Sequence, residues 1–135
     1  MKSNQTSVVI SLFVDGEKVL TETRLLEDYK NPQVLIPGGI VKDFETEEEA
    51  LIREVSEELG VTILEFEKIP VDEEIRGIKN QLLIPFFVKR WEGFLPEVIL
   101  DKGNKLKWLD IDKVLKSPIQ PTRKVVEAFK KYLKK

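Results

Sequence analysis

The chain has 135 residues, with 22 basic and 24 acidic side chains and a net charge of −2. This length suits a single domain spanning 1–135, and the balanced charge gives no reason to expect nucleic acid as a partner. Cysteine and histidine are both absent, which excludes disulfides, thiolate or imidazole metal sites, and Ser-His-Asp chemistry. Acid–base work would fall to carboxylates, lysine, tyrosine or metal-bound water. Neither a membrane-spanning run nor a signal-peptide core is present, so we expect a cytoplasmic protein without membrane association.

The first part of the chain predicts three strands. Residues 7–14 (SVVISLFV) predict a buried strand, and the turn signal at 15–16 joins it to a hairpin partner at 18–24. Residues 31–39 (NPQVLIPGG) predict a short strand between turn formers, which leads into a glycine-containing loop.

A helix is expected next. Thr46 and Glu49 have the spacing of a capping box, and Gly60 is well placed to end the helix. Between them runs an apolar stripe with helical spacing, made of Leu51, Val55 and Leu59.

The second half of the chain predicts more strands and a final helix. Strands are expected at 61–69, at 81–91 and at 105–109, and Pro85 implies that the second of these is an edge strand or carries a bulge. A helical turn is expected at 112–115. An amphipathic helix should follow at 121–133, with its inward positions at Val125, Val126, Phe129 and Leu133. Strands interrupted by two helices indicate an α/β layered domain.

Three glutamates at spacing i, i+3 and i+4 carry most of the functional information. Glu54, Glu57 and Glu58 would share one face of the helix, where their charges repel unless a cation lies among them. Oxygen ligands in this number suit a hard cation such as magnesium. The alternative is a solvated acidic surface, which we accept for the first-turn glutamates 47–49 because negative charge is favourable there. Glu57 and Glu58 lie at the opposite end, where it is unfavourable.

The segment GIVKDFETEEEALIREVSEELGV at 39–61 resembles the Nudix box, G-x5-E-x7-R-E-hydrophobic-x-E-E-x-G-hydrophobic. All of the fixed positions are filled, by Gly39, Glu45, Arg53, Glu54, Val55, Glu57, Glu58, Gly60 and Val61. The resemblance implies the Nudix fold, a mixed β-sheet sandwiched between α-helices, with the box as a loop–helix–loop unit.

The resemblance also implies a metal site. Mg²⁺, or Mn²⁺ as a substitute, would be bound by the carbonyl of Gly39 and by the carboxylates of Glu54, Glu57 and Glu58. Arg53 would brace Glu57 or Glu45. Glu45 would not touch the metal itself but would support the residues that bind it. Without a metal site, Arg53 would be an ordinary exposed helix residue, and Gly38 and Gly39 would form a simple turn.

The implied reaction is hydrolysis of a diphosphate bond, with Glu54, Glu57 and Arg53 as the catalytic residues. The general base that accepts a proton from water would be Glu54 or a carboxylate from a later loop. Glu97 and Asp101 are candidates for the later loop, although the simpler interpretation of each is a surface residue. Gly38 and Arg24 would contact the substrate, Arg24 through a phosphate, unless Arg24 is an ordinary charge at a strand end.

Four aromatic residues could stack on a nucleobase: Phe44, Tyr29, Phe87 and Trp108. Of these, Phe87 and Trp108 are expected in the core.

The compact chain and the RWEG segment at 90–93 resemble the MutT branch of the family, which implies a nucleoside triphosphate pyrophosphohydrolase giving a monophosphate and pyrophosphate. Thr122 stands where an asparagine for oxidised guanine is expected, which argues against that specificity. The alternatives are an ADP-ribose or sugar-nucleotide pyrophosphatase, a non-catalytic Nudix-like nucleotide-binding module, and a plain acidic interaction domain. The expected partner is a small nucleotide, and the protein would be a monomer or homodimer.

Overall fold

The computed structural model describes residues 5–95, 98–99 and 104–134. The strands are β1 Ser7–Asp15, β2 Lys18–Arg24, β3 Gln33–Leu35, β4 Gly38–Ile40, β5 Thr62–Lys68, β6 Ile75–Arg76, β7 Leu82–Glu92, β8 Val98–Ile99 and β9 Lys105–Asp110. The helices are α1 Glu47–Leu59, α2 Ile111–Val114 and α3 Gln120–Leu133, with a 3₁₀ turn at Ile78–Asn80. The expected elements are confirmed to within a few residues, whereas the 3₁₀ turn and the short strands β6 and β8 were not predicted.

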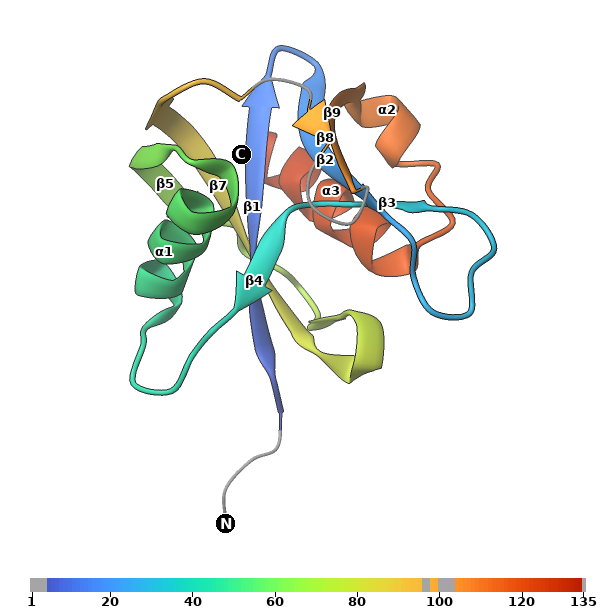
Figure 1. The fold of residues 1–135 in the computed structure, drawn as a ribbon, viewed down its shortest axis with the longest axis horizontal. Helices are drawn as coiled ribbons and strands as arrows, with labels where there is room; N and C mark the ends of the chain where they lie inside the picture. The colour runs from blue at the N-terminus through green and yellow to red at the C-terminus, as the bar shows by residue number, and fades with distance from the viewer. Residues whose placement is uncertain (1–4, 96–97, 100–103, 135) are drawn as a thin grey trace.

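The described strands form one mixed sheet in the order β5-β7-β1-β2-β9-β8. In addition, β3 pairs with β2, β4 with β1, and β6 with β7. The long central pair of β1 and β7 is parallel, while the other pairs are antiparallel. This topology and the flanking helices confirm the mixed sheet expected for a Nudix fold (Figure 1).

Strand β1 supplies both cores through its alternation. Val9 and Phe13 pack with residues of α1, whereas the alternate residues Val8, Ile10 and Leu12 pack with residues of α3. Successive side chains of a strand point to opposite faces, so α1 and α3 cover the two faces of the sheet (Figure 1). A continuous apolar run is what a strand buried on both faces requires.

The hairpin of β1 and β2 opens soon after its turn. The two strands pair only at Val14 with Val19 and at Asp15 with Lys18. Beyond that point β1 pairs with β4, and β2 pairs with β3. The strand expected at 31–39 is therefore two short strands with different partners. They separate at Pro37, which has no amide N–H and whose carbonyl accepts from the Ser11 amide at 2.9 Å.

Two details of the expected pattern are wrong. Pro85 lies inside β7, and the register with β1 continues through it without a shift. On the other side of β7, pairing with β5 ends at Phe86 and pairing with β6 begins at Leu83, so the missing N–H of Pro85 falls between two partners. Leu133 is 54% exposed. Tyr132 instead covers the inner side, with its ring centroid 6.1 Å from that of Phe87.

Within the residues that the structure describes, no helix is both long enough and apolar enough to cross a bilayer.

Candidate active site

Helix α1 holds the box residues through well-defined ends. The Glu49 amide donates to Oγ1 of Thr46 at 3.1 Å, and the Thr46 amide donates to Oε1 of Glu49 at 2.8 Å, which completes the expected capping box. Gly60 ends the helix in the left-handed conformation, with φ of 71°. Leu51 and Val55 are buried against the sheet, and the face that carries Arg53 and Glu54 is thereby turned toward the preceding loop.

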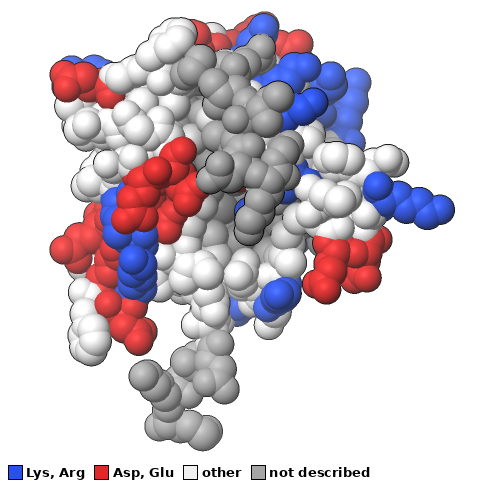
Figure 2. Space-filling model, in the orientation of Figure 1, with Lys and Arg blue, Asp and Glu red and all other residues white. Residues whose placement is uncertain are grey.

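Arg53 contacts three carboxylates of the box. Its Nε and Nη2 donate to the two carboxylate oxygens of Glu45 at 2.6 and 2.9 Å, a bidentate pair. Its Nη1 donates to Glu54 at 2.8 Å and to Glu57 at 3.3 Å, and Nη2 also donates to the Ile40 carbonyl at 3.0 Å. Figure 2 shows acidic side chains gathered over α1 with basic atoms among them. One guanidinium therefore ties the loop before the helix to two glutamates on it.

These contacts change the proton affinities of the pair. The hydrogen bonds from Arg53, followed by the one from the Lys42 amide, lower the pKa of Glu45 to about 2. The same hydrogen bonds, to Glu45 first and Glu54 second, raise the pKa of Arg53 above its usual range. Both groups thus stay charged at neutral pH, and the brace persists.

The backbone at Gly39 lies directly against Glu54. A Cβ atom added to Gly39 would fall 2.0 Å from Cδ of Glu54, so no larger residue fits while Glu54 keeps its position. The ladder hydrogen bonds of β1 at Ser11 and Ser7 imply by alternation that the Gly39 carbonyl accepts from Val9. A carbonyl oxygen has a second lone pair that can bind another partner. By the same alternation, the N–H and C=O groups of Gly38 point away from β1.

The donor groups suit a hard divalent cation, although they are not gathered around one point. Among the described residues, no three acidic side chains lie close enough together to hold a metal ion. Glu54 and Glu57 share Arg53 instead, whereas Glu58 acts electrostatically on Glu22 of β2. The nearby donors are carboxylate and carbonyl oxygens, the ligands that Mg²⁺ and Mn²⁺ prefer. Because Gly39 has no Cβ, its backbone lies directly against the Glu54 carboxylate, so these oxygen donors fit Mg²⁺ or Mn²⁺ in their chemistry.

A pocket of about 120 Å³ opens where β1 and β2 separate. Its walls include Ile10 of β1, Glu22 and Arg24 of β2, and Thr122 and Val125 of α3. This volume exceeds the space needed by one water several times over.

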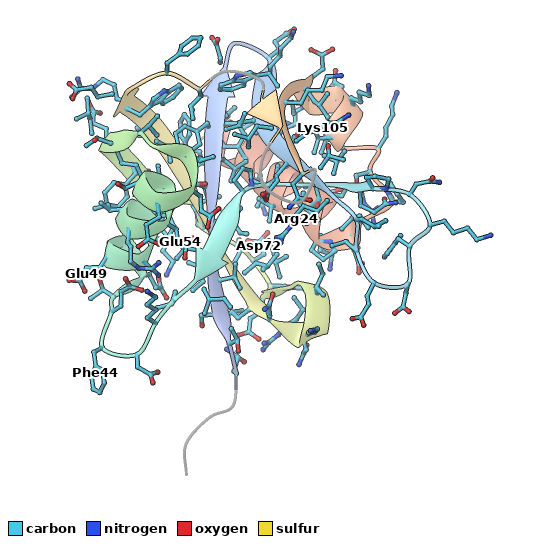
Figure 3. The ribbon with its side chains drawn as sticks, viewed as in Figure 1. Arg24, Phe44, Glu49, Glu54, Asp72 and Lys105 are labelled. Carbon is cyan, nitrogen blue, oxygen red and sulfur yellow. The ribbon has the colours of Figure 1, made fainter. Side chains whose placement is uncertain are left out.

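Gly38 connects the pocket to the box. It lines the pocket, and it also lines a smaller cavity that reaches Glu54. Figure 3 shows Glu54 on one side of β4 and Arg24 on the other. The pocket and the smaller cavity therefore share Gly38 as a wall.

The other residues singled out from the sequence lie in three kinds of place. Phe44 and Tyr29 are exposed and do not line the pocket. Phe87 packs edge-on against Phe129 at 4.9 Å between ring centroids, and Trp108 packs beside the core on the α1 side, as expected. Glu97 and Asp101 lie outside the described residues. The Thr122 hydroxyl donates to the Val34 carbonyl at 3.0 Å, so it offers a ligand only an acceptor.

Glu22 is a site residue that the sequence reasoning missed. It lies in the pocket wall, half-buried, two residues before Arg24. Burial raises the pKa of the Glu22 carboxyl, Arg24 opposes this, and Glu58 adds to it. The signal was present in the sequence, because Glu22 and Arg24 alternate along one face of the predicted strand with the apolar Leu20.

Comparison with known proteins agrees with the box and the fold. A family model described as NUDIX domain matches residues 3–129. A curated relative from Buchnera aphidicola subsp. Schizaphis graminum, an 8-oxo-dGTP diphosphatase, is 29% identical over 79% of this chain and 78% of its own.

Two solved structures show the same fold. One is MutT, from work on Aliivibrio salmonicida and Vibrio cholerae, with a TM-score of 0.68, 22% identity and coverage of 93% of this chain and 99% of that one. The other is the NUDIX domain of Shewanella oneidensis NrtR in complex with ADP ribose, with a TM-score of 0.73, 18% identity and coverage of 98% and 90%.

Proposed function

This chain belongs to the NUDIX domain family and is a MutT-like Nudix hydrolase, and we propose that its reaction is Mg²⁺-dependent hydrolysis of nucleoside triphosphates to a monophosphate and pyrophosphate. One observation carries the catalytic part of this proposal. Arg53 joins Glu45, Glu54 and Glu57 in a single hydrogen-bonded group, directly beside the Gly39 backbone. A solvated acidic surface would not need this bracing.

The metal would be held by Glu54, Glu57, Glu58 and the second lone pair of the Gly39 carbonyl. When bound, Mg²⁺ neutralises charge on phosphate oxygens and lowers the pKa of a bound water. Mn²⁺ is expected to substitute, because it accepts the same oxygen ligands.

Arg53 and Glu45 would position these ligands. Arg53 occupies Oε1 of Glu54, while Oε2 lies beside Gly39, where an added Cβ would be 2.3 Å away. Glu54 is thereby fixed in one rotamer with one oxygen directed at the backbone. We assign Glu54 as the group that accepts a proton from the attacking water, and Arg53 and Glu45 as positioning residues.

The pocket and Arg24 would hold the rest of the substrate. A nucleobase would enter the pocket between Ile10 and Val125, and its phosphates would pass Gly38 toward the box. Arg24, at the end of β2 and in the pocket wall, would pair with a phosphate oxygen.

A panel of substrates tests the proposal. Nucleoside triphosphates, ADP-ribose and dinucleoside polyphosphates would each be incubated with Mg²⁺, and the phosphorus-containing products identified. We expect monophosphate and pyrophosphate from a triphosphate, with the highest kcat/KM of the panel. A higher value for ADP-ribose would establish the sugar-nucleotide alternative. Binding without turnover of any compound would establish a nucleotide-binding module. Glu54→Gln serves as the inactive control in each assay.

A further inference from the structure

Phe44 is exposed at a backbone position that is unfavourable for it. It lies in the loop between β4 and α1, and its relative exposure of 107% means that the side chain is in water on all sides. Its φ of 66° lies in the left-handed region, which disfavours a bulky side chain and favours glycine. Figure 3 shows the ring at the outer end of the loop, directed away from the sheet. Two costs therefore coincide at Phe44, and no packing within the described part of the chain offsets them.

An apolar pocket opens close to this loop. Its volume is about 440 Å³, and Glu47, three residues after Phe44, forms part of its wall. The pocket lies at the edge of β7 where pairing with β5 has ended and pairing with β6 has not begun, at Ile84 and Pro85. Because no described strand pairs with β7 there, the side chains of the neighbouring segments border an open space. The other apolar residues that line it are Ile69, Pro70, Val71, Leu82 and Leu83.

The pocket suits an aromatic side chain, although Phe44 does not fill it within its own chain. Pockets of roughly 300–1,000 Å³ accept small organic ligands, and a phenyl ring is smaller than most of these. Val71 of the pocket wall is 39% exposed, so apolar surface is left in water on both the loop and the pocket. Transfer of a phenyl ring from water into an apolar pocket is favourable because it removes apolar area from water.

We propose that this chain forms a two-fold symmetric dimer in which Phe44 of each copy enters the pocket beside Val71 of the other. In a two-fold interface the same surface is used on both copies, so the anchor and the receiving pocket must lie on one face of the chain. Glu47 meets this requirement, since it follows Phe44 closely and also lines the pocket. A second copy is the occupant because one chain carries both halves of the contact and uses neither internally.

The charges around the two halves are complementary. Lys42 and Asp43 directly precede Phe44 and are exposed, so both signs of charge accompany the anchor. The pocket wall also carries both signs, with Lys68 and Glu74 among its residues. These two side chains belong to exposed ion pairs, which are weak and exchange readily. The dimer therefore brings Asp43 to Lys68 and Lys42 to Glu74 without burying an unpaired charge.

The size of the contact predicts a reversible dimer. A buried aromatic side chain covers about 150–250 Å². Two such anchors and the pockets around them reach the low end of specific interfaces, below about 1,200 Å² in total. We therefore expect a dissociation constant in the micromolar range.

Sedimentation equilibrium of the full chain, at protein concentrations from about 1 μM to about 1 mM, tests the inference. Wild type should change from monomer to dimer across this range. Phe44→Gly should weaken association about a thousandfold, because each dimer loses two anchors and one anchor of this kind is worth about thirtyfold or more. Glycine adopts a positive φ freely, so the Tm of this variant, measured where wild type is monomeric, should not fall below the wild-type value.

A substitution in the pocket gives the complementary test. Val71→Arg places a long charged side chain in the pocket and should abolish the dimer as Phe44→Gly does. An equal mixture of the two variants should form dimers only about thirtyfold weaker than wild type, because one intact anchor still meets one intact pocket. Phe94→Gly and Leu64→Arg are the controls. They make the same changes at exposed apolar residues that do not line the pocket, and they should associate as wild type does.

Several outcomes would overturn the inference. A wild type that stays monomeric would leave Phe44 to a partner of another kind, and a dimer that survives Phe44→Gly would place the interface elsewhere. Assembly beyond the dimer, or no association in the mixture of variants, would exclude the reciprocal contact. A lower Tm of monomeric Phe44→Gly would show that Phe44 packs within its own chain. These results do not depend on whether any nucleotide is hydrolysed, so the proposed function stands or fails separately.

Discussion

The box on α1 and the pocket between β1 and β2 are built in opposite ways. The box draws its polar groups from one continuous segment, and Arg53 binds three of its carboxylates. The pocket draws its walls from strands β1, β2 and β7 and from helix α3, and its Glu22 carboxylate has no bonded partner among the described residues. One region satisfies its charges internally, whereas the other leaves a carboxylate unpaired within the described part of the chain.

Under the proposed function, this difference would separate catalysis from selectivity. The contacts that brace the box do not depend on which base is bound, so a change there should affect turnover of every substrate. The pocket would contact only part of the substrate, so a change there should alter the ranking of substrates. Four predictions test this division, from the largest expected effect to the smallest.

Removing a charge from the box should have the largest effect. Glu57→Gln should reduce turnover of all triphosphates about a hundredfold or more and weaken metal binding, the scale for losing a ligand or a closely supporting group. Glu48→Gln, an exposed position in the first turn of α1, is the matched control and should keep full activity. Metal titrations followed by kinetic assays give both quantities. Identical titration curves for wild type and Glu57→Gln would remove Glu57 from the proposed metal site.

Replacing Arg53 should lower kcat by about a hundredfold with little change in KM, because misplaced catalytic groups lose transition-state stabilisation. Arg53→Lys should recover little of this loss. A lysine cannot bind both Glu45 oxygens and still reach Glu54, contacts that Arg53 makes at 2.6, 2.9 and 2.8 Å. Steady-state kinetics of the alanine and lysine variants give the measurement, and full activity with lysine would mean that charge alone is required.

Replacing Arg24 should have a smaller effect on turnover, and the effect should differ between substrates. Arg24→Ala should reduce kcat/KM for triphosphates about tenfold, the scale of one charge-assisted hydrogen bond. Diphosphate sugars, with fewer phosphate charges, should be affected less. Side-by-side assays of a triphosphate and ADP-ribose give the ratio. Equal losses for both substrates would place Arg24 outside the recognition of the third phosphate.

The smallest expected effect is on acid stability. Arg53 lowers the pKa of Glu45 from 4.5 to about 2, so its stabilisation is complete above about pH 4.5 and is lost as the pH falls toward 2. The Tm difference between wild type and Arg53→Ala should therefore be widest above pH 4.5 and should narrow toward pH 2. Arg90→Ala, which removes an exposed ion pair with Glu65, gives the comparison. A Tm difference that stays constant across this range would contradict the linkage.

The box was predictable because its signals are local. The capping box at Thr46 and Glu49, the stripe of Leu51 and Val55, and the cap at Gly60 all lie within one helix and its ends. Caps and periodicity are sufficient to predict this helix, whereas the role of its glutamates and Arg53 came from the resemblance to the Nudix box.

The pocket was less predictable because its parts meet only in the folded sheet. Arg24 was found as a strand end, but Glu22 beside it was passed over, since its surroundings come from residues far along the chain. Pro85 was misjudged for the same reason. A proline is tolerated at this position because β5 ends and β6 begins beside it on the far side of β7, which no local pattern reveals. The break at Pro37 likewise depends on β1 and β2 taking different partners.

The parallel pairing of β1 with β7 has a consequence for how the chain folds. Ser7 pairs with Leu82, and Phe13 pairs with Val88, so the first strand to be synthesised must wait for a partner made much later. Contacts this distant in sequence carry a large loop-closure cost and slow the folding of a domain. Until β7 emerges, the edge of β1 that faces β7 is unpaired and able to pair with other chains. The helix that carries the box can form its turns early, but its buried face has a complete surface to pack on only when that central pair has closed.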